Sequence, residues 1–257
     1  MTGSQPPLAI VTGGHRRLGA RIAMHLARAG YALAIHGRHD AVPHPILEEC
    51  LGETGATWHG FVADFLEPDA AETLVPAIID HFGRAPDLLV NSAAIFGQDR
   101  LETVTEEDLA RHFTVNTSAP VLLSRHFASL SRPAGANASI VNILDQRLVQ
   151  PHGDQLAYTL AKCALEGFTR LAARELAPAL RVNAVAPGLT LATEDYAPEQ
   201  LDRLADAMPL ARLPAAEDVA EAVLYFARAS AVTGQTLFVD AGAHMRSYAR
   251  DFMHLDG

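Results

Sequence analysis

The sequence lacks the cysteine pairs of disulfide-linked proteins, the excess of basic residues of nucleic-acid-binding proteins and the long apolar runs of membrane-spanning proteins. Its two cysteines, Cys50 and Cys163, form no CxxC pair and fit no disulfide framework. Lys and Arg number 20 against 30 Asp and Glu, and the formal net charge is −10, which disfavours nucleic acid and anionic membrane surfaces as partners. No apolar run reaches the length of about 20 residues that a membrane helix needs.

These absences lead us to expect a reduced, cytoplasmic protein that binds neither nucleic acid nor a membrane. The first residues, Met1 to Pro7, lack the apolar core of a signal peptide. The 12 histidines follow no metal-ligand spacing such as HExxH, so we expect no metal site.

Strand-like apolar runs alternate with helical patterns along the chain, and hydrophobic residues make up 49% of it. This alternation predicts a single doubly wound, Rossmann-type α/β domain over residues 1–257, with a mainly parallel sheet of about seven strands. The least regular stretch, residues 187–213, follows the sixth strand and is the predicted substrate loop. The expected strands are Leu8–Thr12, Tyr31–His36, Thr57–Ala63, Asp87–Asn91, Ala138–Ile143, Leu180–Val185 and Thr236–Val239. The expected helices include Leu18–Ala29, Asp69–Phe82, Thr105–Arg111, Thr114–Ser131, Gln155–Leu176, Pro198–Ala207 and Ala216–Ala229.

A glycine-rich turn, Thr12–Gly19, joins the first expected strand to the first expected helix. Gly13 permits a tight turn, Gly14 lets the backbone approach a pyrophosphate, and Gly19 permits close contact between helix and strand. The free N–H groups at the helix N-terminus favour a phosphate. An ordinary strand–helix turn is the alternative, but the flanking strand and helix favour a dinucleotide site.

The end of the second strand indicates which dinucleotide is bound. An acidic residue about 20 positions after the glycines would bind the ribose of NAD. Here the sequence reads His36-Gly37-Arg38, so the carboxylate is missing. Arg38 can bind the 2′-phosphate of NADPH, with Arg16 or Arg17 as a second charge. Arg38 could instead be a solvated surface residue, but the glycine beside it favours NADPH.

Tyr158 and Lys162 lie one turn apart on the same face of the expected helix Gln155–Leu176. A nearby ammonium favours the tyrosinate, so we expect a lowered pKa for the Tyr158 phenol and a role for it as a proton shuttle. A surface Tyr/Lys pair is the alternative, because the YxxxK pattern is common by chance.

Several short motifs keep an order and spacing that span nearly the whole chain: TGGHRRLG at 12–19, Asn91-Ser92-Ala93-Ala94, Asn116, Tyr158-x-x-x-Lys162 and Pro187-Gly188. Together they resemble the motifs of the short-chain dehydrogenase/reductase family. The resemblance implies that Lys162 also holds the nicotinamide ribose, that Asn116 supports a proton relay through water, and that the protein is a homo-oligomer, with a tetramer favoured. It implies further that the adenosine side is lined by Asp64, Asn91, Ser92 and Ala93.

Three positions depart from the common pattern of that family. Arg17 stands where the family usually has a second glycine, and Asp145 stands where it usually has a serine. Phe96 closely follows the Asn-Ser-Ala-Ala turn. All three features resemble the pteridine reductase branch, near which the dihydromonapterin reductases lie. The resemblance implies a small, pterin-like substrate.

The chemistry of Asp145 and Phe96 agrees with such a substrate. A ketone reductase needs a hydrogen-bond donor beside the developing alkoxide, which an ionised carboxylate would repel. A reduced pterin instead offers N–H donors and a basic ring nitrogen, and Phe96 can stack on its flat ring. The alternatives are a helix-capping or turn carboxylate for Asp145 and a core or loop aromatic for Phe96.

We therefore expect an NADPH-dependent reductase that transfers a hydride to a C=N bond of a pterin or dihydropterin. The alternatives are a ketone or 3-oxoacyl reductase of the same family and a non-catalytic protein that senses NADPH. The expected catalytic residues are Asn116, Asp145, Tyr158 and Lys162, and the expected substrate-binding residues are Arg17, Phe96, Asp145, Tyr158 and Leu189. The expected cofactor-binding residues are Gly13, Arg16, Arg17, Leu18, Gly19, His36, Gly37, Arg38, Asp64, Asn91, Ser92, Ala93, Tyr158, Lys162, Pro187 and Gly188.

Overall fold

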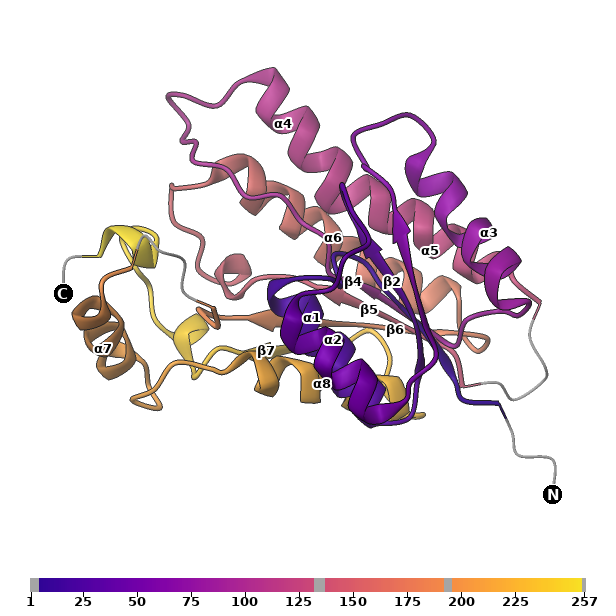
Figure 1. Cartoon of the computed structure of the whole chain (residues 1–257). Coiled ribbons are helices and arrows are strands. Elements are labelled where there is room, and N and C mark those ends of the chain that lie inside the picture. Colours follow the sequence, from indigo (N-terminus) through magenta and orange to yellow (C-terminus); the bar gives the residue numbers. More distant parts are fainter. Residues whose placement is uncertain (1–4, 132–136, 192–195, 256–257) are drawn as a thin grey trace.

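Seven parallel strands form a single sheet in the computed structural model, which describes residues 5–131, 137–191 and 196–255 (Figure 1). The strands lie in the order β3-β2-β1-β4-β5-β6-β7. The predicted doubly wound α/β fold with a parallel sheet is confirmed. The strands are β1 (Leu8–Val11), β2 (Ala32–Gly37), β3 (Trp58–Val62), β4 (Leu88–Asn91), β5 (Ser139–Ile143), β6 (Arg181–Pro187) and β7 (Thr236–Val239).

The strand order reverses at β1, which pairs with β2 on one side and with β4 on the other. The chain therefore crosses over on opposite faces of the sheet on the two sides of this point. The carboxyl ends of β1 and β4 are left uncovered by the crossovers, which is the place where open α/β sheets bind ligands.

Helices cover both faces of the sheet (Figure 1): α1, α2 and α8 pack on one face, and α3, α5 and α6 pack on the other. In β1, Ala9 and Val11 face the first layer, whereas Leu8 and Ile10 face the second, because successive side chains of a strand point to opposite faces. None of the helices in the described part of the chain is both long and apolar enough to cross a membrane. The helices are α1 (Arg17–Arg28), α2 (Pro45–Thr54), α3 (Ala70–Phe82), α4 (Glu106–Phe113), α5 (Ala119–Ser129), α6 (Leu156–Glu175), α7 (Pro198–Ala207) and α8 (Ala216–Arg228).

The expected helix Thr114–Ser131 does not begin as an α-helix. A π-helical turn, η1 (Thr114–Ser118), joins α4 to α5 instead. Pro120 has no N–H to donate four residues back, and its ring crowds the preceding turn, so the chain takes a wider turn there. This turn carries Asn116, one of the predicted catalytic residues.

Candidate active site

A cleft of about 680 Å³ lies beyond the carboxyl ends of the strands. Gly37 lines a smaller pocket beside it. Asn91 and Asn116 do not line either space. The other predicted residues all line the cleft: Gly13, Arg16, Arg17, Leu18, Gly19, His36, Arg38, Asp64, Ser92, Ala93, Phe96, Asp145, Tyr158, Lys162, Pro187, Gly188 and Leu189.

The glycine-rich turn leaves no room for side chains. A methyl group on Gly19 would lie 2.1 Å from the backbone oxygen of Gly13, and Gly13 itself adopts a φ of +62°. The Thr12 hydroxyl fixes the neighbouring strand end by accepting hydrogen bonds from the backbone N–H groups of Ser92 and Ala93, both at 3.0 Å. The first turn of α1 holds no acidic residue and no capping side chain. Its N–H groups are therefore free to bind a phosphate, which fits a dinucleotide.

His36 holds this turn from β2 as a neutral ring. Its Nδ1 accepts a hydrogen bond from the backbone N–H of Gly13 at 3.2 Å, which leaves Nε2–H to donate to the backbone oxygen of Ala63 at 2.8 Å. The ring also stacks on Phe65, with centroids 4.4 Å apart. Burial lowers the pKa of His36 to about 4. His36 thus lines the cleft while shaping the glycine turn.

The smaller pocket, of about 220 Å³, is bordered by basic side chains at the end of β2. Arg38 Nε donates to Asp64 at 2.9 Å, and Arg16 pairs with Asp40 at 2.8 Å. A methyl group on Gly37 would lie 2.2 Å from the backbone oxygen of Asp40, so this position excludes every side chain, including the carboxylate that would bind the ribose of NAD.

At the other end of the cleft, Tyr158 and Asp145 are in direct contact. The Tyr158 hydroxyl donates to Asp145 Oδ2 at 3.0 Å. Asp145 Oδ1 accepts from the backbone N–H and the Nε of Arg147, at 3.0 and 3.1 Å. Asp145 therefore also caps the short helix Gln146–Leu148 that follows β5. The capping role given as an alternative for Asp145 and its contact with Tyr158 are thus both present.

The expected lowering of the Tyr158 pKa is wrong. Burial and the carboxylate of Asp145 raise the pKa of this phenol well above its ordinary value. Lys162 Nζ lies 5.6 Å from the centroid of the Tyr158 ring and donates to the backbone oxygen of Ile143 at 2.7 Å. Burial lowers the pKa of Lys162 to about 8. Tyr158 is consequently a protonated hydrogen-bond donor.

Asn116 and Asn91 lie behind the surface of the cleft. The amide of Asn116 binds the backbone of Ile95 through both of its atoms, with Oδ1 accepting at 2.8 Å and Nδ2 donating at 2.9 Å. Asn116 thereby fixes the segment that carries Phe96. Asn91 is buried and donates to the Asn142 amide oxygen at 2.8 Å.

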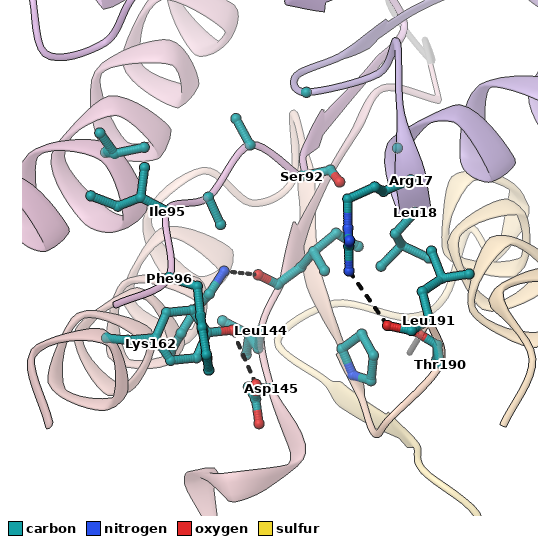
Figure 2. A pocket seen from close by; sticks show the side chains of 18 of the residues that line it. Arg17, Leu18, Ser92, Ile95, Phe96, Leu144, Asp145, Lys162, Thr190 and Leu191 are labelled. Carbon is teal, nitrogen blue, oxygen red and sulfur yellow. Dashed lines mark hydrogen bonds between the residues drawn. The ribbon is translucent and has the colours of Figure 1, made fainter. Parts of the chain in front are cut away.

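Phe96 is not a core residue, because 49% of it is exposed. Its ring meets the Tyr158 ring edge-on, with centroids 4.8 Å apart. Figure 2 shows Phe96 and Asp145 on one side of the cleft and Arg17 on the other, where its guanidinium reaches the backbone oxygen of Leu191 at 3.4 Å. A flat ligand placed between them would contact Phe96.

Sequence reasoning missed several residues at the substrate end, among them Arg147, Asp251, Phe252 and Met253, which all line the cleft. Arg147 could have been found, because it follows Asp145 closely at the end of a strand. No local pattern marks the other three, which come from a distant segment near the end of the chain.

Comparison with known proteins identifies the class. The family model described as enoyl-(acyl carrier protein) reductase matches residues 14–244. The chain is 32% identical to pteridine reductase 1 of Leishmania tarentolae, over 94% of this chain and 97% of that protein. It is 33% identical to the 3-oxoacyl-[acyl-carrier-protein] reductase FabG of Pseudomonas aeruginosa, over 94% of this chain and 98% of that protein.

A solved structure gives the same result for the fold. FolM alternative dihydrofolate reductase 1 from Brucella canis, complexed with NADP, superposes with a TM-score of 0.87 and 33% identity, covering 96% of this chain and 97% of that one. The chain belongs to the short-chain dehydrogenase/reductase family and is an oxidoreductase.

Gly19→Ala tests the tight turn. We expect this variant to lose nucleotide binding and about 1–3 kcal/mol of stability, because the added methyl overlaps the Gly13 oxygen. Gly52→Ala in α2 is the matched control, since open space surrounds that position and the change should stabilise by about 0.5–1 kcal/mol. Thermal unfolding with and without NADPH measures both effects. Wild-type NADPH affinity in Gly19→Ala would contradict this view of the turn.

His36→Asn tests the neutral imidazole. The folded-state pKa of about 4 lies below the ordinary histidine pKa of 6.5, so the stability linked to His36 is complete above about pH 6.5 and falls as the pH drops toward 4. The linked loss is about 3 kcal/mol. Asn can still accept from Gly13 but does not titrate, so urea unfolding should show a smaller loss between pH 7 and pH 4. An equal loss in both proteins would refute the linkage.

Proposed function

We propose that this protein is an NADPH-dependent reductase of a pterin or dihydropterin. The observation that carries the proposal is the Asp145 carboxylate, whose Oδ2 accepts the Tyr158 hydroxyl at 3.0 Å while two N–H donors of Arg147 hold Oδ1. A carboxylate beside the proton donor repels an alkoxide but accepts hydrogen bonds from the N–H groups of a reduced pterin.

Phe96 supports a flat, aromatic substrate. It is half-exposed and lines the cleft beside Tyr158, so one of its faces can stack on a heterocycle. Arg17 borders the same space, as do residues 187–191 and Tyr196 from the predicted substrate loop 187–213. Part of that segment, residues 192–195, lies outside the described residues.

The choice of NADPH over NADH depends on the smaller pocket at the end of β2 and its basic side chains. Arg16 and Arg38 both line the smaller pocket, and each pairs with a partly exposed carboxylate, so both guanidinium groups are available to a 2′-phosphate placed there. Gly37 excludes the acidic residue that NAD would need. The relative from Brucella canis, which was solved with NADP, supports the same choice.

A bound NADPH would supply the hydride. Tyr158, protonated and hydrogen-bonded to Asp145, delivers or relays the proton to the ring nitrogen. Asp145 orients the heterocycle, and Phe96 stacks on it. Lys162 holds the nicotinamide ribose, which requires its ammonium to exchange the backbone oxygen of Ile143 for ribose hydroxyls or to bind both.

The second candidate function is reduction of a ketone or a 3-oxoacyl group. The 33% identity to FabG of Pseudomonas aeruginosa favours it. Under this alternative the Asp145 carboxylate would repel the alkoxide that Tyr158 protonates and so slow the reduction. A serine in place of Asp145 should then raise the rate of ketone reduction.

Our proposal extends to the oligomeric state of the protein and to its location in the cell. Leu160 and Leu171 on α6 are 42% and 71% exposed, and an apolar helix face of this kind fits a homo-oligomer, with a tetramer favoured by family resemblance. We propose that this oligomer works in the cytoplasm on a small-molecule substrate.

Asp145 variants separate the two functions. With purified protein, the absorbance of NADPH should fall with dihydrobiopterin, dihydromonapterin or dihydrofolate and not with ketones. Asp145→Ala should lower kcat/KM for the pterin by about 100-fold or more, because an orienting charge beside the reacting atoms is lost. Asp202→Ala, an exposed carboxylate on α7, is the control. Turnover of ketones alone, raised in Asp145→Ser, would establish the second candidate instead.

Arg38→Ala tests the choice of cofactor. Losing a charge-assisted contact with the 2′-phosphate should weaken NADPH binding by about 10- to 100-fold and leave NADH binding unchanged. Arg111→Ala, which removes an exposed arginine from α4, is the control. Nicotinamide fluorescence during titration reports both affinities. Equal weakening of NADPH and NADH would show that Arg38 does not read the phosphate.

A further inference from the structure

A buried ion cluster joins Asp145 to the C-terminal part of the chain. Arg147 and Asp251 are each only 5% exposed, although both carry charge. Every N–H-bearing nitrogen of the Arg147 guanidinium has its own acceptor: Nε binds Asp145 at 3.1 Å, Nη1 binds Gln155 at 2.8 Å and Nη2 binds Asp251 at 2.9 Å. A guanidinium held in this way fixes the relative positions of all three partners.

The segment 251–253 is anchored from more than one side. The backbone N–H of Asp251 donates to Asp154 at 2.9 Å, and Asp154 is itself buried and held by Arg250 at 3.1 and 3.2 Å. Gln200 on α7 donates to the backbone oxygens of Phe252 and Met253, at 3.2 and 3.3 Å.

The anchored segment borders the place where the substrate would lie. Phe252 and Met253 line the cleft together with Asp145 and Tyr158. The Arg147 guanidinium carbon lies 5.3 Å from the centroid of the Tyr158 ring and 5.6 Å from that of Phe96. Arg147 therefore touches both the aromatic wall and the C-terminal wall of the substrate end.

We propose that Arg147 and Asp251 are positioning residues, which hold the Asp145 carboxylate against the Tyr158 hydroxyl and couple it to the C-terminal segment 251–253 as a wall of the substrate site. The effect on turnover rests on the proposed function, whereas the coupling between Asp145 and this segment does not.

The balance of charge in the cluster sets the direction in which each variant should shift its protonation. Two carboxylates, Asp145 and Asp251, lie near two buried cations, Arg147 and Lys162. Another carboxylate, the buried Asp154, is paired separately with Arg250 and Arg100. Removing the Arg147 charge leaves two carboxylates with one ammonium, so protons are taken up more readily. Removing the Asp251 charge leaves Asp145 as the carboxylate partner of Arg147 within this cluster. The cluster then carries less negative charge and takes up protons less readily. The charged and titratable groups around Asp145 and Asp251 are Arg147, His152, Asp154 with its partner Arg250, Tyr158, Lys162 and Cys163.

The neighbouring groups do not reverse this direction. Burial lowers the pKa of His152, whose Nε2 lies 3.7 Å from Asp251, and burial raises the pKa of Cys163. Both are therefore neutral near pH 7. Burial opposes the charge of Arg147, but the carboxylates of Asp145 and Asp251 outweigh burial and raise the pKa of the guanidinium. Arg147 thus stays charged across the working range.

The first test is hydrogen exchange of the full chain with NADPH bound, followed by mass spectrometry. In Arg147→Met, and also in Asp251→Asn, the amides of residues 251–255 should exchange at least 10-fold faster than in the wild type, while β1 and β2 remain unchanged. Asp145→Asn should accelerate the same amides, because coupling is reciprocal. Arg170→Met, which removes an exposed ion pair on α6, should leave them unchanged. Unaltered exchange at 251–255 in the cluster variants would overturn the proposal.

The second test is the pH dependence of kcat/KM with the pterin substrate. The acid limb should move to higher pH in Arg147→Met and to lower pH in Asp251→Asn, and Arg147→Lys should return it toward the wild type. Opposite shifts cannot arise from a general loss of folding. Shifts in the same direction, or lower rates with an unmoved limb, would refute the positioning role. Should the wild type reduce no pterin, the proposed function fails and hydrogen exchange alone decides the coupling.

Discussion

The site depends on the reversal of strand order at β1. Because the chain crosses to opposite faces on its two sides, no crossover covers the carboxyl ends of β1 and β4, and backbone groups there remain open to a ligand. The packing of Gly19 on the Gly13 oxygen then sets α1 so close to the sheet that its uncapped first turn opens on this crevice. The neutral ring of His36 holds the same turn through the backbone N–H of Gly13.

The substrate end has a different physical basis, which is the balance of buried charge. Asp145 can stand beside the Tyr158 phenol because Arg147 supplies two N–H donors to its other oxygen. The carboxylate in turn keeps the phenol protonated, since burial and negative charge both oppose the tyrosinate. A serine at this position would leave the guanidinium of Arg147 with Asp251 as its one carboxylate partner in the described cluster. The aspartate and the arginine therefore belong together as one structural unit.

The features predicted from the sequence are those whose cause is local. The glycine turn, the alternation of strands and helices and the spacing of Tyr158 and Lys162 all follow from short patterns. The pKa of Tyr158 was predicted wrongly because helical spacing places the ammonium near the phenol but does not reveal burial or a facing carboxylate. The π-helical turn depends on Pro120 inside a continuous helix. The contact between Arg147 and Asp251 joins positions 104 residues apart, which only the folded sheet brings together.

The two halves of the cleft differ in how strongly dissolved ions can act on them. Arg16 and Arg38, whose side chains are 66% and 45% exposed, lie within reach of solvent counterions, and the attraction of such groups for an anion weakens as ionic strength rises. The side chains of Arg147 and Asp251, at 6% and 7% exposure, are shielded from the same ions. If Arg16 and Arg38 bind the dinucleotide as proposed, concentrated salt would weaken that binding and leave the geometry around Tyr158 intact. The occupancy of the cofactor site and the chemical competence of the substrate end would then respond separately to the surrounding electrolyte.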